Sequence, residues 1–233
     1  TNCYGYHSTL SGVGAYLEGG LMDRCTIVSN RIGGSSSSGS QDALYATDTT
    51  VRNTLVAQNR QDHKNCARAG VQAAANAILE NCTIVSNQAY KALAVDVAGG
   101  LYFASAQVVT ARNNIVYGNT CDQGATAAEY AGYRADYVTA ANNCVPTRSP
   151  SIAFGSACVE ADAGQPLFVA FADGDYRLAR NSVCRDKGVD QEWMTGATDL
   201  AGHKRKVGTV DIGCYECGSF ATVIMLRQIK ETA

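Results

Sequence analysis

The stretch Asn81-Cys82-Thr83-Ile84-Val85-Ser86-Asn87 recurs along the chain with small changes. The other copies span residues 24–30 (RCTIVSN), 53–59 (NTLVAQN) and 113–119 (NNIVYGN). Successive copies start 29, 28 and 32 residues apart, which is too regular for chance and too short for a domain. A repeat of this length is typical of one supersecondary unit in a stack. The spacing therefore predicts a solenoid.

Two positions of the repeat predict which face of a strand points inward. The fourth position is β-branched in every copy, and the second is small or compact. Because side chains alternate along a strand, both positions lie on the same face, which we assign to the interior. The predicted interior column consists of Ile27, Val56, Ile84 and Val116.

The first position of each copy predicts a tight corner between two strands. It holds Asn53, Asn81 and Asn113 in three copies and Arg24 in the fourth. Asparagine tolerates the left-handed backbone that a tight corner requires. Just before the corner, an apolar residue is followed by a charged one in every copy, so a second strand with one apolar face runs into it.

A third strand is expected earlier in the unit, around Tyr16, Tyr45 and Tyr102, which precede the repeat by 8, 8 and 11 residues. Three short strands per repeat describe one rung of a right-handed parallel β-helix. A helical solenoid is the competing interpretation, but β-branched and aromatic clusters between Gly and Asn favour strands. The predicted fold is all-β, with β-helix rungs over residues 1–145 and an irregular C-terminal segment over 146–233 that closes the same solenoid.

Composition limits the class of protein. The chain has 233 residues, a net charge of -2 and a charged fraction of 17%, which predicts no basic face for nucleic acid. The sequence contains neither a signal peptide nor an apolar run long enough to span a membrane. It opens in mid-pattern, so we expect a mature product or a fragment whose exposed solenoid ends favour self-association.

The cysteine content indicates an oxidising compartment. Ten cysteines are many for a chain of this size, and chains rich in cysteine without metal-like spacing are typical of extracellular proteins. A cytosolic protein with free thiols is the alternative. Cys214 and Cys217 form a C-x-x-C pair, but no second pair accompanies them, which argues against a zinc site.

The solenoid geometry restricts which cysteines can be bonded. Cys25 and Cys82 hold the same rung position two turns apart, so their Cα atoms should lie about 9–10 Å from each other. A disulfide cannot bridge that distance, and both are predicted to be buried thiols. The preferred disulfides lie outside the regular rungs and are Cys144 with Cys158 and Cys184 with Cys214.

Three tyrosines are candidate binding residues. Tyr130, Tyr133 and Tyr137 fall close together in a stretch that keeps the repeat poorly. Exposed tyrosines near a groove are typical of contacts with sugars or proteins. The alternative is that they only cover the side of the solenoid.

The loop after Asn59 holds the best catalytic candidates, which are Asp62, His63, Lys64 and Arg68. The favoured interpretation is that all of them are solvated turn residues. An active-site face would show titratable side chains in successive rungs, but the neighbouring turns hold Ser35–Ser38 and an alanine-rich stretch. This absence favours a protein that is not an enzyme.

The C-terminal third carries five motifs in a fixed order. They are QPLFV (165–169), GDYRL (174–178), SVCRDKG (182–188), DLAGHKR (199–205) and VDIGCYE (210–216). This succession resembles the signature that closes the solenoid in the choice-of-anchor Q group of right-handed parallel β-helix proteins. Gln165 replaces the usual Asp of that signature, and Cys214 replaces the usual Ala.

The resemblance is informative about the cellular location of the protein but not about its activity. Members of that group are typically secreted or surface-held bacterial proteins, and most have no established activity. The resemblance therefore implies a bacterial protein that is secreted or held at the cell surface. The aspartates of these motifs are Asp175, Asp186, Asp199 and Asp211. Aspartate in turns usually bonds its own backbone, and calcium binding is the alternative role; no other cofactor is expected.

Two classes of function remain open. One is a non-catalytic extracellular module, either a structural or adhesive rod or a carbohydrate binder, that uses the long flat faces of a solenoid. The other is a polysaccharide lyase, hydrolase or epimerase, which rests on analogy between folds. A uronate lyase would need a base and cations clustered on one outer face.

Overall fold

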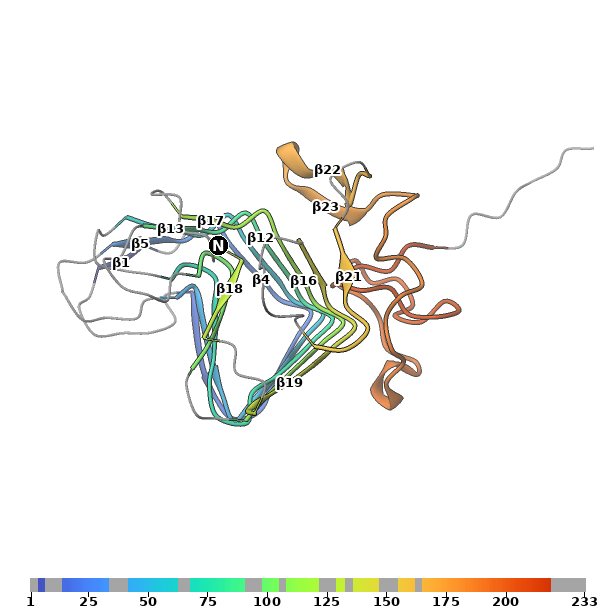
Figure 1. The fold of residues 1–233 in the computed structure, drawn as a ribbon, viewed down its shortest axis with the longest axis horizontal. Coiled ribbons are helices and arrows are strands. Elements are labelled where there is room, and N and C mark those ends of the chain that lie inside the picture. The colour runs from blue at the N-terminus through green and yellow to red at the C-terminus, as the bar shows by residue number, and fades with distance from the viewer. Residues whose placement is uncertain are drawn as a thin grey trace, which may run out of the picture.

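The fold is a right-handed parallel β-helix, as predicted. The computed structural model describes residues 4–6, 14–33, 42–62, 68–90, 98–104, 108–121, 129–132, 136–146, 155–161 and 165–218. Four parallel sheets, here called A to D, run along the stack, so each rung has one strand more than predicted. Figure 1 looks along the stack, so that equivalent strands of successive rungs overlap.

The strands are short, and each sheet contains one strand from each rung. Sheet A contains β1 (Tyr4–Tyr6), β5 (Arg31–Gly33), β9 (Arg60–Gln61), β13 (Gln88–Ala89) and β17 (Thr120–Cys121). Sheet B contains β2 (Ala15–Glu18), β6 (Leu44–Thr47), β10 (Val71–Ala73), β14 (Leu101–Phe103) and β18 (Tyr130–Ala131). Sheet C contains β3 (Leu21–Asp23), β7 (Thr50–Arg52), β11 (Ile78–Glu80), β15 (Val109–Arg112) and β19 (Val138–Ala141). Sheet D contains β4 (Thr26–Val28), β8 (Leu55–Ala57), β12 (Thr83–Val85), β16 (Ile115–Tyr117), β20 (Cys144–Val145) and β21 (Val159–Glu160).

The predicted interior column is confirmed. Ile27 is paired with Val56, Val56 with Ile84, and Ile84 with Val116 across sheet D, and all four side chains lie in the main hydrophobic core. β21 extends sheet D beyond the predicted boundary at residue 145.

The predicted corners are also confirmed. They have left-handed backbone, with φ between 48° and 57°, at Arg24, Asn53, Asn81, Asn113 and Asn142. Arg24 adopts the same conformation as the asparagines, so the geometry of the corner is retained where the residue type changes. Because an arginine is less tolerant of this region than an asparagine, the stacked rungs impose the corner conformation there.

A ladder of buried asparagines runs through the interior at the last position of the repeat, a role that the sequence pattern alone does not reveal. The Nδ2 atoms of Asn30, Asn59 and Asn87 each donate to the Oδ1 atom of the asparagine in the next rung, over 2.8, 2.8 and 2.9 Å. The same Oδ1 atoms accept the backbone N–H of the preceding asparagine. Asn119 is the last member, and it donates to a carboxylate oxygen of Glu129 over 2.8 Å. The ladder thus ends on an acceptor in place of a further asparagine.

The ladder needs space beside it. A Cβ atom at Gly100 would lie 2.7 Å from Nδ2 of Asn119 and 2.3 Å from the carbonyl oxygen of Glu129. No side chain fits there, so glycine at this position lets two rungs approach closely enough for the amide contacts.

Replacement of one member of the ladder should strongly destabilise the fold. In Asn87→Ala, the amide groups of Asn59 lose their buried acceptor, and the cost should be roughly 2–5 kcal/mol because each buried unsatisfied group costs about 1–3 kcal/mol. Chemical denaturation measures the loss. Asn181→Ala is the control, since Asn181 is exposed and should change stability by less than about 0.5 kcal/mol. Equal effects of the two substitutions would contradict a structural role for the ladder.

The C-terminal segment, residues 165–218, lies along the flank of the solenoid instead of across its end. It contains the antiparallel pair β22 (Phe168–Ala170) and β23 (Asp175–Leu178) and the 3₁₀ helices η1 (Phe171–Asp173) and η2 (Glu192–Met194). Its apolar side chains pack on the outer face of sheet D, which is itself apolar. The solenoid residues in this second core include Leu55, Ala57, Val85, Ile115 and Cys144, and the segment contributes Leu167, Phe168, Tyr176, Cys184, Ile212 and Cys214. Figure 1 shows the segment beside sheet D.

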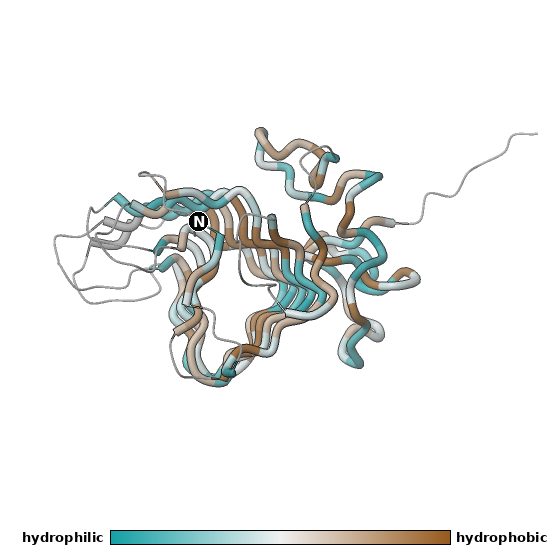
Figure 2. Tube along the Cα trace, in the orientation of Figure 1, coloured by the Kyte–Doolittle hydropathy of each residue, from teal (hydrophilic) through white to brown (hydrophobic). Residues whose placement is uncertain are grey.

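The corner asparagines hold this segment by hydrogen bonds. Nδ2 of Asn81 donates to the carbonyl oxygen of Asp211 over 3.0 Å. Asn113 forms two bonds of 2.8 Å with the backbone of Val189, one as donor and one as acceptor. Asn53 accepts from Nη1 of Arg205 over 3.3 Å. Figure 2 shows this corner as a hydrophilic stripe facing the segment. The corner side chains are therefore docking groups as well as turn formers.

A buried ion pair organises the docked segment. Arg205 is fully buried and binds Glu216 over 2.7 Å and the carbonyl oxygen of Gly213 over 3.0 Å. Burial raises the pKa of Glu216 to about 7, although Arg205 counteracts it. The carboxylate of Asp199 accepts the N–H of Glu216, and that of Asp211 accepts the N–H of Cys217. These charged residues of the C-terminal motifs thus form structural bonds within the segment.

Loss of Arg205 should release the segment. Arg205→Met leaves Glu216 buried without its partner, which should cost about 3–5 kcal/mol. Limited proteolysis should then cleave between residues 165 and 218 while the solenoid persists. Arg177→Met is the matched control, because Arg177 is exposed and its pair with Asp175 is screened by solvent. Cleavage that is no faster in Arg205→Met than in the control would contradict this role.

The eight cysteines in the described part of the chain are all free thiols. Cys82 is buried as predicted, whereas Cys25 is only half-buried because it lies on the outermost described rung of sheet D. The predicted bond between Cys144 and Cys158 is wrong. Cys144 points outward into the second core, while Cys158 packs against the interior, so the two thiols lie on opposite faces of the sheet. The predicted bond between Cys184 and Cys214 is also wrong, because both are free thiols and the Cys214 side chain is hydrogen-bonded to Thr83.

Candidate functional site

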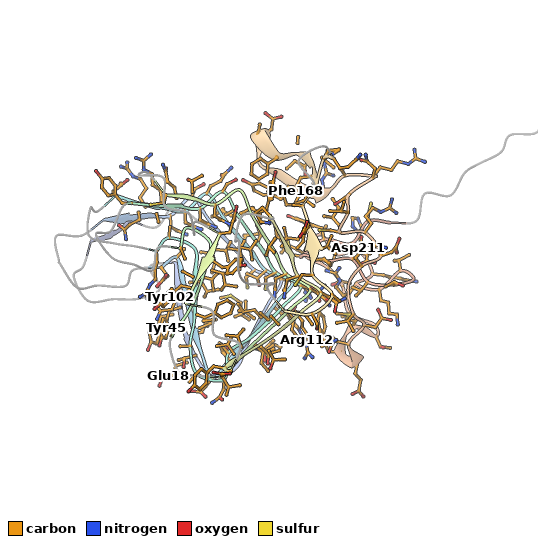
Figure 3. All side chains as sticks on the ribbon, in the orientation of Figure 1. Glu18, Tyr45, Tyr102, Arg112, Phe168 and Asp211 are labelled. Carbon is orange, nitrogen blue, oxygen red and sulfur yellow. The ribbon has the colours of Figure 1, made fainter. Side chains whose placement is uncertain are left out.

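The outer face of sheet B carries a column of polar aromatic side chains. Tyr16 is the register partner of Tyr45, Tyr45 of Gln72, and Gln72 of Tyr102. Together with Arg68, we call these residues the tyrosine face. They point outward because Ala15, Leu44, Val71 and Leu101, one position earlier in each strand, point into the core. Figure 3 shows Tyr45 and Tyr102 on the flank away from the C-terminal segment.

The N-terminal half of this face is an aromatic stack. The rings of Tyr16 and Tyr45 lie 4.8 Å apart, centroid to centroid, and are tilted by only 9°. Tyr16 is 54% exposed. Partial burial, helped by neighbouring Tyr16 and Glu18, raises the pKa of Tyr45, so its phenol stays protonated and can donate a hydrogen bond. The stack therefore offers ring edges, hydroxyl groups and one open ring surface.

The C-terminal half combines an aromatic ring with a cation. The guanidinium carbon of Arg68 lies 3.5 Å from the centre of the Tyr102 ring. Nη1 of Arg68 donates to Oε1 of Gln72 over 2.7 Å, which fixes the guanidinium in the gap in the tyrosine column. Stacking on a ring leaves the edge of a guanidinium free to donate to a ligand.

A buried carboxyl group lies behind Arg68. Asp42 has no exposed surface, and neither carboxyl oxygen has a hydrogen-bond partner among the described residues. Burial raises the pKa of Asp42 to about 7, although the positive charge of Arg68 opposes this shift. Asp42 is thus partly protonated near neutral pH, and its charge acts on Tyr45 as well as on Arg68.

This arrangement can bind a ligand rich in hydroxyl groups. Phenols, an amide and a guanidinium supply donors and acceptors on a flat surface, and aromatic rings supply apolar contact. Such a surface suits an extended chain that lies across successive rungs.

The predicted catalytic residues do not form one cluster in the described structure. Asp62 lies beside sheet A, where it accepts two bonds from Arg31 of 2.8 and 2.6 Å and one from Arg60 of 2.9 Å. Arg68 instead contacts residues of sheet B. His63 and Lys64 lie outside the described residues. Asp62 is therefore held by two arginines, which suits a structural role better than a catalytic one.

The predicted tyrosine cluster is only partly described, and its first member is not on the surface. Tyr130 lies in the core, because it is the register partner of the inward-pointing Leu101. Ala131 takes the outward position in the column of the tyrosine face. Tyr137 is half-buried, and Tyr133 lies outside the described residues. Because the repeat is irregular around residues 130–137, the sequence alone does not show which residues there face inward.

The sequence identifies Tyr16, Tyr45 and Tyr102 only as markers of a strand. All three occupy the same position of the repeat, which indicates that their side chains share one face. Gln72 occupies that position in the unit between Tyr45 and Tyr102. Arg68 could not be assigned to this face, because its distance from Tyr102 in the sequence says nothing about the turn between them.

A second candidate surface is a hollow of about 450 Å³ on the C-terminal segment. Its lining includes Val169, Leu178, His203, Tyr215 and Glu216. Glu216 already binds Arg205, so its carboxylate is used within the protein. We therefore regard the tyrosine face as the stronger candidate.

The chain matches none of the family models, curated proteins or solved structures with which it was compared. Within the described residues, no group of three or more His, Cys, Asp or Glu side chains could hold a metal ion. No helix in that part of the chain is long and apolar enough to cross a membrane.

The buried Asp42 should make stability depend on pH. Its folded pKa of about 7 lies above its ordinary value of 3.8, so its contribution to stability is fully present below about pH 4 and is lost as the pH rises through about 7. Asp42→Asn mimics the protonated acid. It should match the wild type near pH 4 and exceed it at pH 8 by roughly 2–4 kcal/mol. Urea unfolding across this range checks the difference, and parallel pH profiles for the two proteins would refute it.

Proposed function

We propose that this chain is a non-catalytic β-helix module that binds carbohydrate through the tyrosine face. It would act outside the cell, as a secreted or surface-held protein of a bacterium. The observation that carries the proposal is the outer face of sheet B, with its stacked Tyr16 and Tyr45 and with Arg68 on the Tyr102 ring. The motifs at 165–216 support the location through their resemblance to surface-held β-helix proteins.

A glycan suits this face better than an apolar partner. The face presents the phenol groups of Tyr45 and Tyr102 and the guanidinium of Arg68, and its polar positions repeat along the stack at the spacing of the strands. A linear polysaccharide presents hydroxyl groups at regular intervals, so one chain can engage several rungs. Proteins that bind through a solenoid commonly use such an extended surface.

The charged residues of the C-terminal motifs support a non-catalytic role. Arg205, Glu216, Asp199 and Asp211 are all buried and bonded within the segment. These four side chains are therefore not available as an acid or a base for a ligand on the tyrosine face. A structural or adhesive rod would use the same flat surfaces, and binding to glycans would be its means of attachment.

Affinity electrophoresis in gels that contain a β-glucan, a xylan, a polygalacturonate or an alginate tests the proposal. At least one polysaccharide should retard the wild type. Arg68→Ala and Tyr45→Ala should each weaken that interaction about tenfold, which corresponds to about 1.4 kcal/mol. Arg177→Ala removes an exposed arginine on the C-terminal segment and should leave it unchanged. Retardation that survives both face substitutions would rule out this surface, and lack of retardation by a broad panel would overturn carbohydrate binding.

The same polysaccharides separate binding from catalysis. Unsaturated uronate product, followed by ultraviolet absorbance, or new reducing ends would show a lyase or a hydrolase. Either result, if abolished by a substitution at Asp62 or His63, would replace the proposal with an enzymatic function.

A further inference from the structure

The second core, between the solenoid and the C-terminal segment, contains three fully buried thiols, and the partly buried Cys217 packs against it. Cys144 belongs to the solenoid, and Cys184 and Cys214 belong to the segment. All three have no exposed surface. Thiols contributed by two separate parts of the chain therefore meet in one buried interface.

Backbone contacts bring the chain around Cys184 to the part of sheet D that contains Cys144. The carbonyl oxygen of Cys184 accepts the N–H of Ile212 over 3.0 Å. The next residue, Gly213, lies so close to the solenoid that a Cβ atom there would be 2.6 Å from Cδ1 of Ile115. Ile115 is the register partner of Cys144 in sheet D. Consistent with this path, the side chains of Cys184 and Cys144 are hydrogen-bonded to each other.

The other thiols nearby have different partners. The Cys214 thiol is hydrogen-bonded to the side chain of Thr83, whose hydroxyl also accepts the N–H of Cys214 over 3.0 Å. Cys158 lies on the opposite face of sheet D, against the interior. Cys144 and Cys184 are therefore the pair whose side chains face each other across the interface.

We propose that Cys144 and Cys184 form a disulfide bond that fastens the C-terminal segment to the solenoid when the protein folds in an oxidising compartment. The oxidant is a low-molecular-weight disulfide. The thiolate of one cysteine attacks it, forms a mixed disulfide and releases one thiol. The thiolate of the second cysteine then displaces the other thiol and closes the protein disulfide. Two protein thiols are thus oxidised and one small disulfide is reduced to two thiols.

The reaction precedes docking of the segment. Once the segment has docked, both thiols are buried and burial raises the pKa of Cys184, so the docked form is slow to react with a soluble oxidant. During folding, both cysteines are exposed and the segment can present Cys184 to the completed rung.

Oxidative refolding of the whole chain in a mixture of oxidised and reduced glutathione tests the proposal. Non-reducing peptide mapping should show Cys144 bonded to Cys184. The Tm of the oxidised protein should exceed that of the reduced protein by roughly 5–15 °C. Cys184→Ser should abolish this redox-dependent shift, and Cys25→Ser, at a half-buried thiol in the first described rung of sheet D, should retain it.

Peptide mapping of the wild type tests the bond even if Cys184→Ser folds poorly. Alkylation of both thiols after oxidative refolding would overturn the proposal. A bond between Cys144 or Cys184 and any other cysteine would overturn it as well. Because this assay involves no glycan, its outcome is independent of the proposed binding function.

Discussion

Hydrogen bonding between rungs is the constraint on which the rest of the structure depends. A strand of two to four residues cannot satisfy its own backbone, so each rung takes its partners from the rungs on either side. The buried ladder from Asn30 to Asn119 applies the same rule to side chains. The hydrogen bonds of each side-chain amide are satisfied only if the asparagines of the adjacent rungs stay in register with it. The ladder therefore links the length of each rung to that of the next and explains why the repeat varies so little.

The solenoid uses its sheets for different purposes. The outer face of sheet D is apolar and is covered by residues 165–218, while the corner beside it supplies amide groups that bind the backbone of that segment. Sheet B keeps a polar outer face, with Tyr45 and Tyr102 on the flank away from that segment (Figure 3). Near the covered side, Glu80 binds Arg112 and Arg52 stacks on Trp193. The surface that completes the fold, on sheet D, is thus separate from the polar face of sheet B.

The sequence reveals the parts of the fold that repeat. Alternation places Ile27 and its equivalents inside, and asparagine at the first position predicts the left-handed corners. The fourth strand of each rung escapes prediction, because β9, β13 and β17 are only two residues long. The interior role of the asparagine at the last position is equally hidden, since a buried amide and an exposed turn amide look alike in a sequence.

Features that depend on contacts between distant segments could not be predicted. The C-terminal motifs were expected to close the end of the solenoid, but the apolar outer face of sheet D draws them to the flank. Tyr130 and Ala131 are neighbours in a stretch with weak periodicity, so which of them faces outward depends on a register that only the structure shows. Arg68 belongs to the tyrosine face through a contact with Tyr102, which lies one rung further along.

The flank position of the C-terminal segment has a mechanical consequence. The segment is hydrogen-bonded to three successive rungs through Asn53, Asn81 and Asn113. A force applied at the C-terminal end of the segment is therefore shared among these three rungs. Such a force shears several amide contacts at once, whereas a segment stacked on the last rung would let the coils unzip one by one. A protein tethered through this end would resist extension far better than the short strands of any single coil suggest.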